Sequence, residues 1–480
     1  MKILWNLAVA CICLVGVFSS CKDYLNVQPE DKYTEEQVFA NENAIQQALN
    51  GLYMSLSSAK LYGANLSTTT IEIMGQRYNT VAASNNSYIY YQQYAYANEN
   101  VMQTFNELWT EGYATITKVN KFIASLAKAQ LNGIISKSKA DLLTGEAIGI
   151  RAMLHFDLLR LYGPVYATGA DKMAIPYYTV ADGISRPILE AKTVVDSVLS
   201  DYSRALSLLQ TDAVRQRGVL FEGDFYGSYR NLRLNYYAIR GLQARTLLYA
   251  GKNAEAAAAA KDVLEEGEKW FPWLSPSAIN QGIAPDRIFS TEVIFGVYNQ
   301  DMYSNFTKYF SPELLNGDLL TALPARLVSM YEGTTTSITD YRYTAVWLPA
   351  NVNPGTVQTT AKFADIAVKN KPWRFLQPLL RKTELYYILA EAQTDNTEAI
   401  AYLNKVRINR GIATALAATA PADAEIQKEY QKELWGEGQL FFYYKRKNRS
   451  SIPAGTSTGN ITMNDVKYVV PLPLSETTPR

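Results

Sequence analysis

The side chains that most often carry catalysis or bind metals are scarce in this chain of 480 residues. Its three cysteines, Cys11, Cys13 and Cys21, all lie at the N-terminus, so the rest of the chain offers no thiolate nucleophile, disulfide or cysteine metal site. His155 is the only histidine, and its apolar surroundings (Ala152–Phe156) are more typical of a packed core residue than of a catalytic base. A two-histidine metal site is excluded and a diagnostic calcium loop is missing, so we predict no metal centre and no cofactor.

The 45 acidic side chains are the remaining candidates for catalysis. A glycoside hydrolase needs only two of them, about 5–10 Å apart, and no acidic residue stands in a setting that singles it out. We therefore predict that the protein is not an enzyme, with a helical glycoside hydrolase as an alternative. The 46 basic side chains nearly cancel the acidic ones, which argues against a nucleic-acid partner.

Aromatic side chains among polar loop residues are better candidates for a binding site. Residues 62–100 are rich in tyrosine, asparagine and serine, and residues 270–376 add tryptophans. A sugar ring has an apolar face of C–H groups and an edge of hydroxyls, so a flat ring beside polar groups suits it. Each stacked ring would contribute roughly 0.5–1.5 kcal/mol, so hydrogen bonds must supply the rest of a micromolar affinity.

Helical segments must hold these loops in place. Apolar residues recur with helical spacing in several segments, and the spacing predicts helices over Glu35–Ser57, Val101–Leu126, Lys139–Leu161, Thr193–Leu209, Leu234–Ala250, Ala254–Gly267, Arg381–Gln393 and Thr397–Arg410. Asn253 is expected to cap the sixth helix, which follows the fifth after Gly251. Such helix hairpins resemble tetratricopeptide units. Alternation over Thr291–Tyr298 predicts one short strand.

The first 20 residues have the features of an export signal. Lys2 precedes the apolar run Ile3–Phe18, and two serines then lead to Cys21. This arrangement resembles a lipobox, although Phe18 stands where leucine is usual. Cys21 would then become the acylated first residue of the mature protein and anchor it in a membrane. The mature chain, residues 21–480, is expected to form a single domain.

Several motifs in the mature chain together resemble the SusD/RagB family, the surface glycan-binding lipoproteins of Bacteroidetes. They occur in the family's order along nearly the whole mature chain, at Cys21–Pro29, Ala48–Tyr53, Gly145–Ala152, Leu161–Val165, Leu380–Leu385, Ala390–Ala392, Leu403–Arg407, Arg410–Gly411, Lys432–Gly438 and Tyr468–Pro473. Ile148–Ile150 and Tyr443–Arg446 are less typical of the family.

The resemblance implies a mainly α fold, with four tetratricopeptide-like helix pairs as a scaffold, long loop-rich insertions and a few short strands. The variable insertions would cover roughly residues 62–100 and 270–376. The resemblance further implies a lipid-anchored protein of the outer membrane, exposed at the cell surface, that captures oligosaccharides for a SusC-like TonB-dependent transporter. A tetratricopeptide-type scaffold for protein interactions is a second alternative, and the glycan itself stays open.

The family's glycan face is commonly lined by the loops after the first helix and by those near residues 298–303. By this analogy of region we predict ligand contacts from nine residues, of which the last two are secondary candidates: Arg77, Tyr78, Asn85, Asn86, Tyr88, Tyr91, Tyr298, Trp273 and Trp347. The charged residues of the motifs are expected instead to join helix pairs through charge-assisted hydrogen bonds. These are Glu146, Arg151, Arg381, Glu384, Glu391, Arg407 and Arg410.

Overall fold

The computed structural model describes residues 38–80, 86–314, 319–333, 338–351 and 357–477. The expected signal segment, Cys21 and the predicted contact Asn85 lie outside the described residues. Within these ranges, no helix combines the length and the apolar character that crossing a membrane requires.

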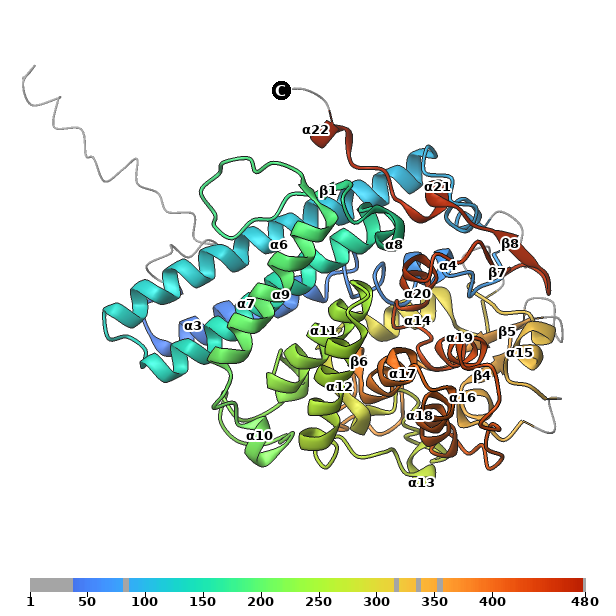
Figure 1. Cartoon of the computed structure of the whole chain (residues 1–480). Helices are drawn as coiled ribbons and strands as arrows, with labels where there is room; N and C mark the ends of the chain where they lie inside the picture. Colours follow the sequence, from blue (N-terminus) through green and yellow to red (C-terminus); the bar gives the residue numbers. More distant parts are fainter. Residues whose placement is uncertain (1–37, 81–85, 315–318, 334–337, 352–356, 478–480) are drawn as a thin grey trace, which may run out of the picture.

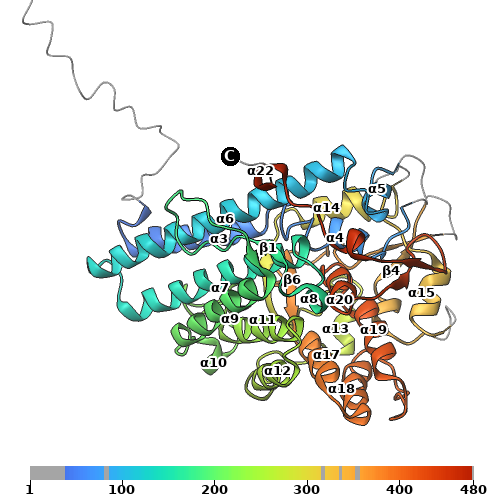
Figure 2. The same cartoon turned by 45° about the horizontal axis from the view of Figure 1, so that its top comes forward.

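The described residues contain four packed helix pairs, which confirms the predicted fold class. The pairs are α3 (Glu42–Leu56) with α6 (Glu99–Leu131), α7 (Lys137–Tyr162) with α9 (Ala191–Leu208), α11 (Tyr236–Tyr249) with α12 (Asn253–Gly267), and α17 (Lys382–Ala392) with α18 (Asn396–Ile408). Each pair contacts the next, and α19 (Ala422–Glu433) packs on the last one. Figures 1 and 2 show the pairs following one another across the molecule.

The expected cap of α12 is wrong. Asn253 is the first residue of that helix, and Lys252 precedes it as the N-cap without a side-chain hydrogen bond. Gly251, at φ 73°, already turns the chain out of α11, so the new helix begins one residue earlier than expected. Gly149 of α7 shows a different use of glycine: a Cβ there would lie 2.2 Å from the Ile239 side chain of α11, so the end of that side chain would have to move aside.

Short strands and helices fill the segments between the pairs. Strand β3 (Val293–Tyr298) pairs antiparallel with β6 (Leu376–Arg381), confirming the predicted strand except for its first residues, which form the 3-10 helix η4 (Ser290–Glu292). The other two-stranded sheets are β1 (Met173–Ile175) with β2 (Leu189–Glu190), β4 (Trp347–Pro349) with β5 (Gln358–Thr360), and β7 (Ser451–Pro453) with β8 (Asn460–Thr462).

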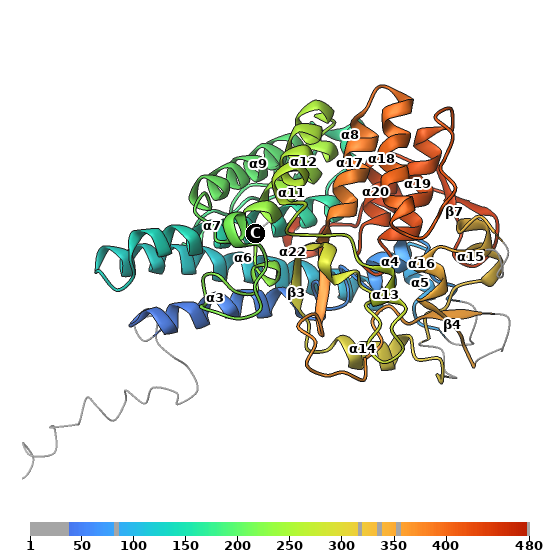
Figure 3. The ribbon, with the colours of Figure 1, turned by 90° about the horizontal axis from the view of Figure 1, so that it is seen from below.

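The insertions gather on one side of the helical layer. In Figure 3, β3, β4 and α14 (Met302–Tyr309) lie along the lower part of the molecule, away from α12, α17 and α18. The remaining short helices are α4 (Thr70–Met74), α5 (Ile89–Gln92), α8 (Tyr166–Gly169), α10 (Val214–Arg217), η3 (Arg230–Leu232), α13 (Pro276–Ile279), α15 (Pro324–Met330), α16 (Tyr341–Thr344), α20 (Leu440–Arg446), α21 (Asp465–Tyr468) and α22 (Leu474–Thr477).

The charged motif residues form buried ion pairs, and several of these pairs join helices, as predicted. Glu433 is fully buried and accepts hydrogen bonds from Arg381, Arg410 and Arg342, and these guanidinium groups hold the pKa of its carboxyl well below the usual range. The other motif residues form comparable pairs: Glu146 with Arg230 and Arg233, Arg151 with Asp201, Glu384 with Arg245, Glu391 with Arg446, and Arg407 with Glu429. They therefore belong to the frame.

His155 is a core residue, as expected. Its ring is fully buried and stacks on Tyr177 with 3.9 Å between ring centroids. Its Nε2 accepts a hydrogen bond from the backbone N–H of Tyr178 at 3.0 Å. Burial lowers the pKa of His155 to about 3, so the imidazole is neutral at physiological pH.

Candidate ligand-binding site

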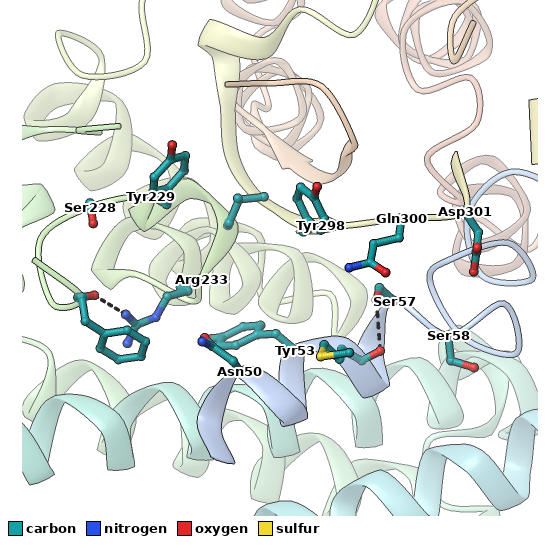
Figure 4. Close-up of a pocket in the computed structure, with 13 residues that line it drawn as sticks. Asn50, Tyr53, Ser57, Ser58, Ser228, Tyr229, Arg233, Tyr298, Gln300 and Asp301 are labelled. Atoms are coloured by element: carbon teal, nitrogen blue, oxygen red, sulfur yellow. Dashed lines mark hydrogen bonds between the residues drawn. The ribbon is translucent and has the colours of Figure 1, made fainter. Parts of the chain in front are cut away.

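A cleft of about 550 Å³ opens where three distant segments meet. One wall comes from α3 and the two serines after it, a second from residues 225–233 before α11, and a third from the end of β3 and residues 300–301. The volume lies within the range of about 300–1,000 Å³ that is typical of small-molecule sites. Figure 4 shows the lining side chains of this cleft.

The floor of the cleft is held by a buried carboxylate on α7. Glu146 accepts hydrogen bonds from the Tyr53 hydroxyl at 2.8 Å, from Nη1 of Arg230 at 2.6 Å, and from Nε and Nη2 of Arg233 at 2.9 and 2.6 Å. Arg230 is bound on its other side by Asp212. Burial and the nearby Glu146 charge raise the pKa of Tyr53 well above its usual value, so its hydroxyl stays protonated as a donor.

Two exposed tyrosines form the aromatic part of the rim. Tyr298 at the end of β3 is 46% exposed and Tyr229 is 39% exposed. Figure 4 shows both on one side of the cleft, opposite Asn50 and Tyr53 of α3. Tyr229 has a left-handed backbone conformation (φ 50°), and its ring packs edge-on against Phe221 at 5.6 Å. The rings are therefore positioned by local contacts yet keep surface free for a ligand.

Polar groups surround these rings. Asn50, Gln300 and the hydroxyls of Ser57, Ser58 and Ser228 line the cleft and can donate or accept hydrogen bonds. Asp301 is the single carboxylate among the described lining residues, and the positive charge of Arg233 is neutralised by Glu146. Aromatic faces beside amides and hydroxyls can bind a flat polyhydroxylated ring. A second carboxylate for acid–base hydrolysis is not found among the described residues that line this cleft.

An aromatic cluster continues from the cleft along α14. Phe375 packs on Tyr298 at 5.3 Å and on Tyr303 at 4.8 Å, and the Arg374 guanidinium lies over Phe375 at 4.4 Å. Asn299 fixes the start of this segment, because its side chain donates to the Gly63 carbonyl at 3.0 Å. The insertion at residues 62–100 thus packs against residues 299–305, and the family resemblance implies that both regions lie on one face.

Arg77 and Tyr78 occupy the core, which corrects their expected place on the binding surface. Both are 1% exposed. Arg77 pairs with Glu72 at 2.5 Å and lies over the Trp435 ring, while the Tyr78 hydroxyl donates to the Thr68 carbonyl at 2.8 Å. Their polar groups are used inside the protein, so neither side chain presents a surface to a ligand.

The predicted contacts Asn86, Tyr88 and Tyr91 differ in how far their side chains are exposed. Asn86 is buried and accepts from the backbone N–H of Tyr88, and Tyr91 is buried with its hydroxyl bonded to Thr104. Tyr88 is half-buried and packs on Tyr91 and on Tyr309 at the far end of α14. These contacts place Tyr88 outside the cleft, although its region lies against the same insertion.

The two tryptophan candidates also lie away from the cleft. Trp347 is half-buried and meets Trp435 edge-on at 4.6 Å. Trp273 is half-buried and stacks on Tyr386 at 5.4 Å. Of the eight predicted contacts that the structure describes, Tyr298 is the one that lines the cleft.

Sequence reasoning missed most of the rim. Asn50 lies within the Ala48–Tyr53 motif, but its exposed position on α3 follows from its place opposite the buried Leu49 and Leu52. Tyr229 and Phe221 stand in an aromatic segment between two helices, the same signal that singled out the other loops. Gln300 and Asp301 directly follow Tyr298, within the region 298–303 that was expected to bind.

Comparisons with known proteins agree with this architecture. The family model described as "Starch-binding associating with outer membrane" matches residues 23–219, and the model described as "SusD family" matches residues 302–467. No match was found among curated proteins.

The chain is also similar to solved structures from Bacteroides. A SusD superfamily protein from Bacteroides thetaiotaomicron is 23% identical with a TM-score of 0.72, covering 91% of this chain and 97% of its own. A SusD-like carbohydrate binding protein from Bacteroides vulgatus is 18% identical with a TM-score of 0.70, covering 91% and 96%. A SusD-like protein from Bacteroides fragilis is 18% identical with a TM-score of 0.66, covering 93% and 98%. At these identities the likeness concerns the fold.

Proposed function

Since this chain belongs to the SusD/RagB family, we propose that it is a cell-surface glycan-binding lipoprotein that captures oligosaccharides for a TonB-dependent outer-membrane transporter. The observation that carries this proposal is the cleft between α3, residues 225–233 and the end of β3, with exposed Tyr229 and Tyr298 among amide and hydroxyl groups. One of the similar structures is itself named as a carbohydrate binding protein.

The cleft supports sugar binding through complementary chemistry. One face of a pyranose or furanose ring would pack on Tyr229 or Tyr298, and its hydroxyls would bond to Asn50, Gln300 or Asp301. The floor adds preorganisation, because Glu146 already fixes Tyr53 and Arg233 before any ligand arrives. A preformed site loses less conformational entropy on binding than one that must be ordered.

The N-terminal segment and the family description support the proposed location at the outer membrane. Acylation of Cys21 would attach the protein to the outer membrane, with the transporter as its partner for uptake. We propose that the cleft binds its glycan without hydrolysing it, on the family likeness and the aromatic and amide lining. Incubation with a bound glycan followed by product analysis tests this point, and shortened products would favour the hydrolase.

The decisive experiment is a glycan array followed by titration of the best ligand. Replacing Tyr298 by Ala removes one stacked ring, so the dissociation constant should rise about 2- to 13-fold, which corresponds to roughly 0.5–1.5 kcal/mol. Tyr90→Ala is the matched control, because Tyr90 is 44% exposed but does not line the cleft. An unchanged affinity for Tyr298→Ala, or an equal loss in both variants, would show that the glycan binds elsewhere.

A further inference from the structure

A second hollow of about 660 Å³ lies between α12, α17 and α18. Its described lining contains four lysines, two glutamates and two tyrosines together with Trp273, and we name it the lysine groove: Lys261, Leu264, Glu265, Glu268, Lys269, Pro272, Trp273, Lys382, Tyr386, Leu389, Tyr402 and Lys405. It shares no residue with the cleft. Figure 3 shows α12, α17 and α18 on the opposite side of the molecule from β3 and α14.

Lys382 is the unusual member of this groove. Its side chain is 1% exposed, and no hydrogen-bond acceptor lies within reach of its Nζ among the described residues. The ammonium instead lies 3.8 Å from the centroid of the Trp273 ring. An ammonium group has three donors, and leaving them unused in a buried position costs free energy that a π face offsets only in part.

The remaining charges of the groove differ in how far they are neutralised. Lys261 pairs with Glu265 at 3.4 Å, and Lys405 with Glu268 at 3.5 Å. Lys269 lies over the Trp270 ring at 4.6 Å, and no ion pair with a described acidic residue is formed. Lys382 and Lys269 are therefore two cations of the groove that form no ion pair with a described carboxylate, although the charges of Glu292 and Glu268 act on Lys382 from a distance.

From this arrangement we propose that the lysine groove is a second sugar site, specific for a residue that carries a single carboxylate, such as a uronic acid. The carboxylate would accept hydrogen bonds from Lys382 and Lys269. The sugar hydroxyls would donate to Glu265 and Glu268, and Leu264 and Leu389 would contact its C–H groups. The two glutamates disfavour an acidic peptide, because its several negative charges would be repelled in the same groove.

This proposal is independent of the ligand in the cleft. The Trp273 ring already stacks on Tyr386 and lies beneath the Lys382 ammonium, so charge and hydroxyl recognition would dominate here over stacking. Burial lowers the pKa of Lys382 to about 8, which leaves the ammonium protonated at pH 7. The cleft, by contrast, offers no unpaired cation among its described lining residues.

To test this proposal, the full-length protein is titrated with glucuronic acid and, in parallel, with glucose. Binding is measured by tryptophan fluorescence and by calorimetry. We expect saturable binding of glucuronic acid and at least tenfold weaker binding of glucose. Lys382→Met keeps the length and apolar character of the side-chain stem, and it should weaken the binding of glucuronic acid at least tenfold. Lys269→Glu changes an exposed position outside the core and should weaken the binding of glucuronic acid at least fivefold. This variant tests the proposal if Lys382→Met does not fold.

Two controls separate this inference from the proposed function. Lys60→Met removes an exposed lysine that pairs with Glu107 outside the groove, and its affinity for glucuronic acid should change less than twofold. Tyr298→Ala should leave glucuronic acid binding unchanged. Wild-type affinity for glucuronic acid in both Lys382→Met and Lys269→Glu overturns the proposal. Loss of binding in Tyr298→Ala also overturns it, because the acidic sugar would then bind in the cleft. Binding of a glutamate-rich peptide in preference to glucuronic acid overturns it in favour of a protein ligand.

Discussion

Replacing Glu146 by Gln should destabilise the protein strongly, because this one carboxylate supports both the frame and the floor of the cleft. Its two oxygens accept four hydrogen bonds, two from Arg233 and one each from Arg230 and Tyr53. Glutamine offers a single acceptor oxygen, and its amide N–H₂ would face donors. Arg230 keeps the Asp212 carboxylate as a partner, whereas Arg233 keeps no carboxylate among the described residues and retains the backbone carbonyl and the ring of Phe225.

The expected loss follows from the burial of the groups involved. Glu146 is fully buried and Arg233 is 6% exposed. Removing one partner of a buried ion pair costs about 3–5 kcal/mol, since the remaining charge is left without compensation. A chain of this length gains roughly 1 kcal/mol/K of entropy on unfolding, so the melting temperature should fall by about 3–5 °C. Chemical denaturation and differential scanning calorimetry measure the two quantities.

The control for this substitution lies on the same helix. Asp141 of α7 pairs with Lys137 at 2.6 Å in an exposed position, so Asp141→Asn should change the free energy of unfolding by less than about 1 kcal/mol. The double variant Glu146→Gln/Arg233→Met should lose less than the sum of its single variants, because the unpaired charge is gone. A Glu146→Gln protein within about 1 kcal/mol of the wild type would refute the importance of this network.

Two further predictions concern pH and the membrane anchor. The folded-state pKa of His155 is about 3 against 6.5 for the free side chain, so the unfolded chain takes up the proton first as the pH falls and stability is lost below pH 6.5. Between pH 7 and 5 the wild type should therefore lose about 2 kcal/mol relative to His155→Gln in urea denaturation, and parallel curves would contradict this. Cys21→Ala should release the protein from the membrane fraction of fractionated cells, whereas Cys13→Ala should not. Retention of Cys21→Ala in that fraction would exclude the thioether anchor.

The frame could be predicted from the sequence because its signals are local. Apolar residues at helical spacing located the long helices, as in α6, where Val101, Phe105 and Leu108 lie on one buried face. The charged motif residues were assigned to packing, and the bonds of Arg381 and Arg410 to Glu433 show why. A charged side chain in a buried segment must find a partner, and here one strand residue and one residue after a helix share the carboxylate of Glu433.

The cleft could not be predicted because it is a product of tertiary structure. Its walls come from residues 50–58, 225–233 and 298–301, which no local pattern connects. Composition also misleads: Tyr78 and Tyr298 both stand in insertions with aromatic and polar residues, yet one is 1% and the other 46% exposed. Exposure depends on what the rest of the chain places over a loop, and Trp435 and Phe310 cover Tyr78.

Substitutions on the floor and on the rim of the cleft differ in how much stability they cost, and this difference affects how binding specificity can change. Floor residues such as Glu146 and Tyr53 are bonded to the helical frame, so their substitution costs stability as well as shape. Rim residues such as Tyr298, Gln300 and Asp301 are exposed, and surface substitutions usually change stability by no more than about 0.5 kcal/mol. Rim side chains can therefore be exchanged with little risk to the fold. The same helix pairs can in this way support clefts for different glycans, provided that the carboxylate beneath them remains.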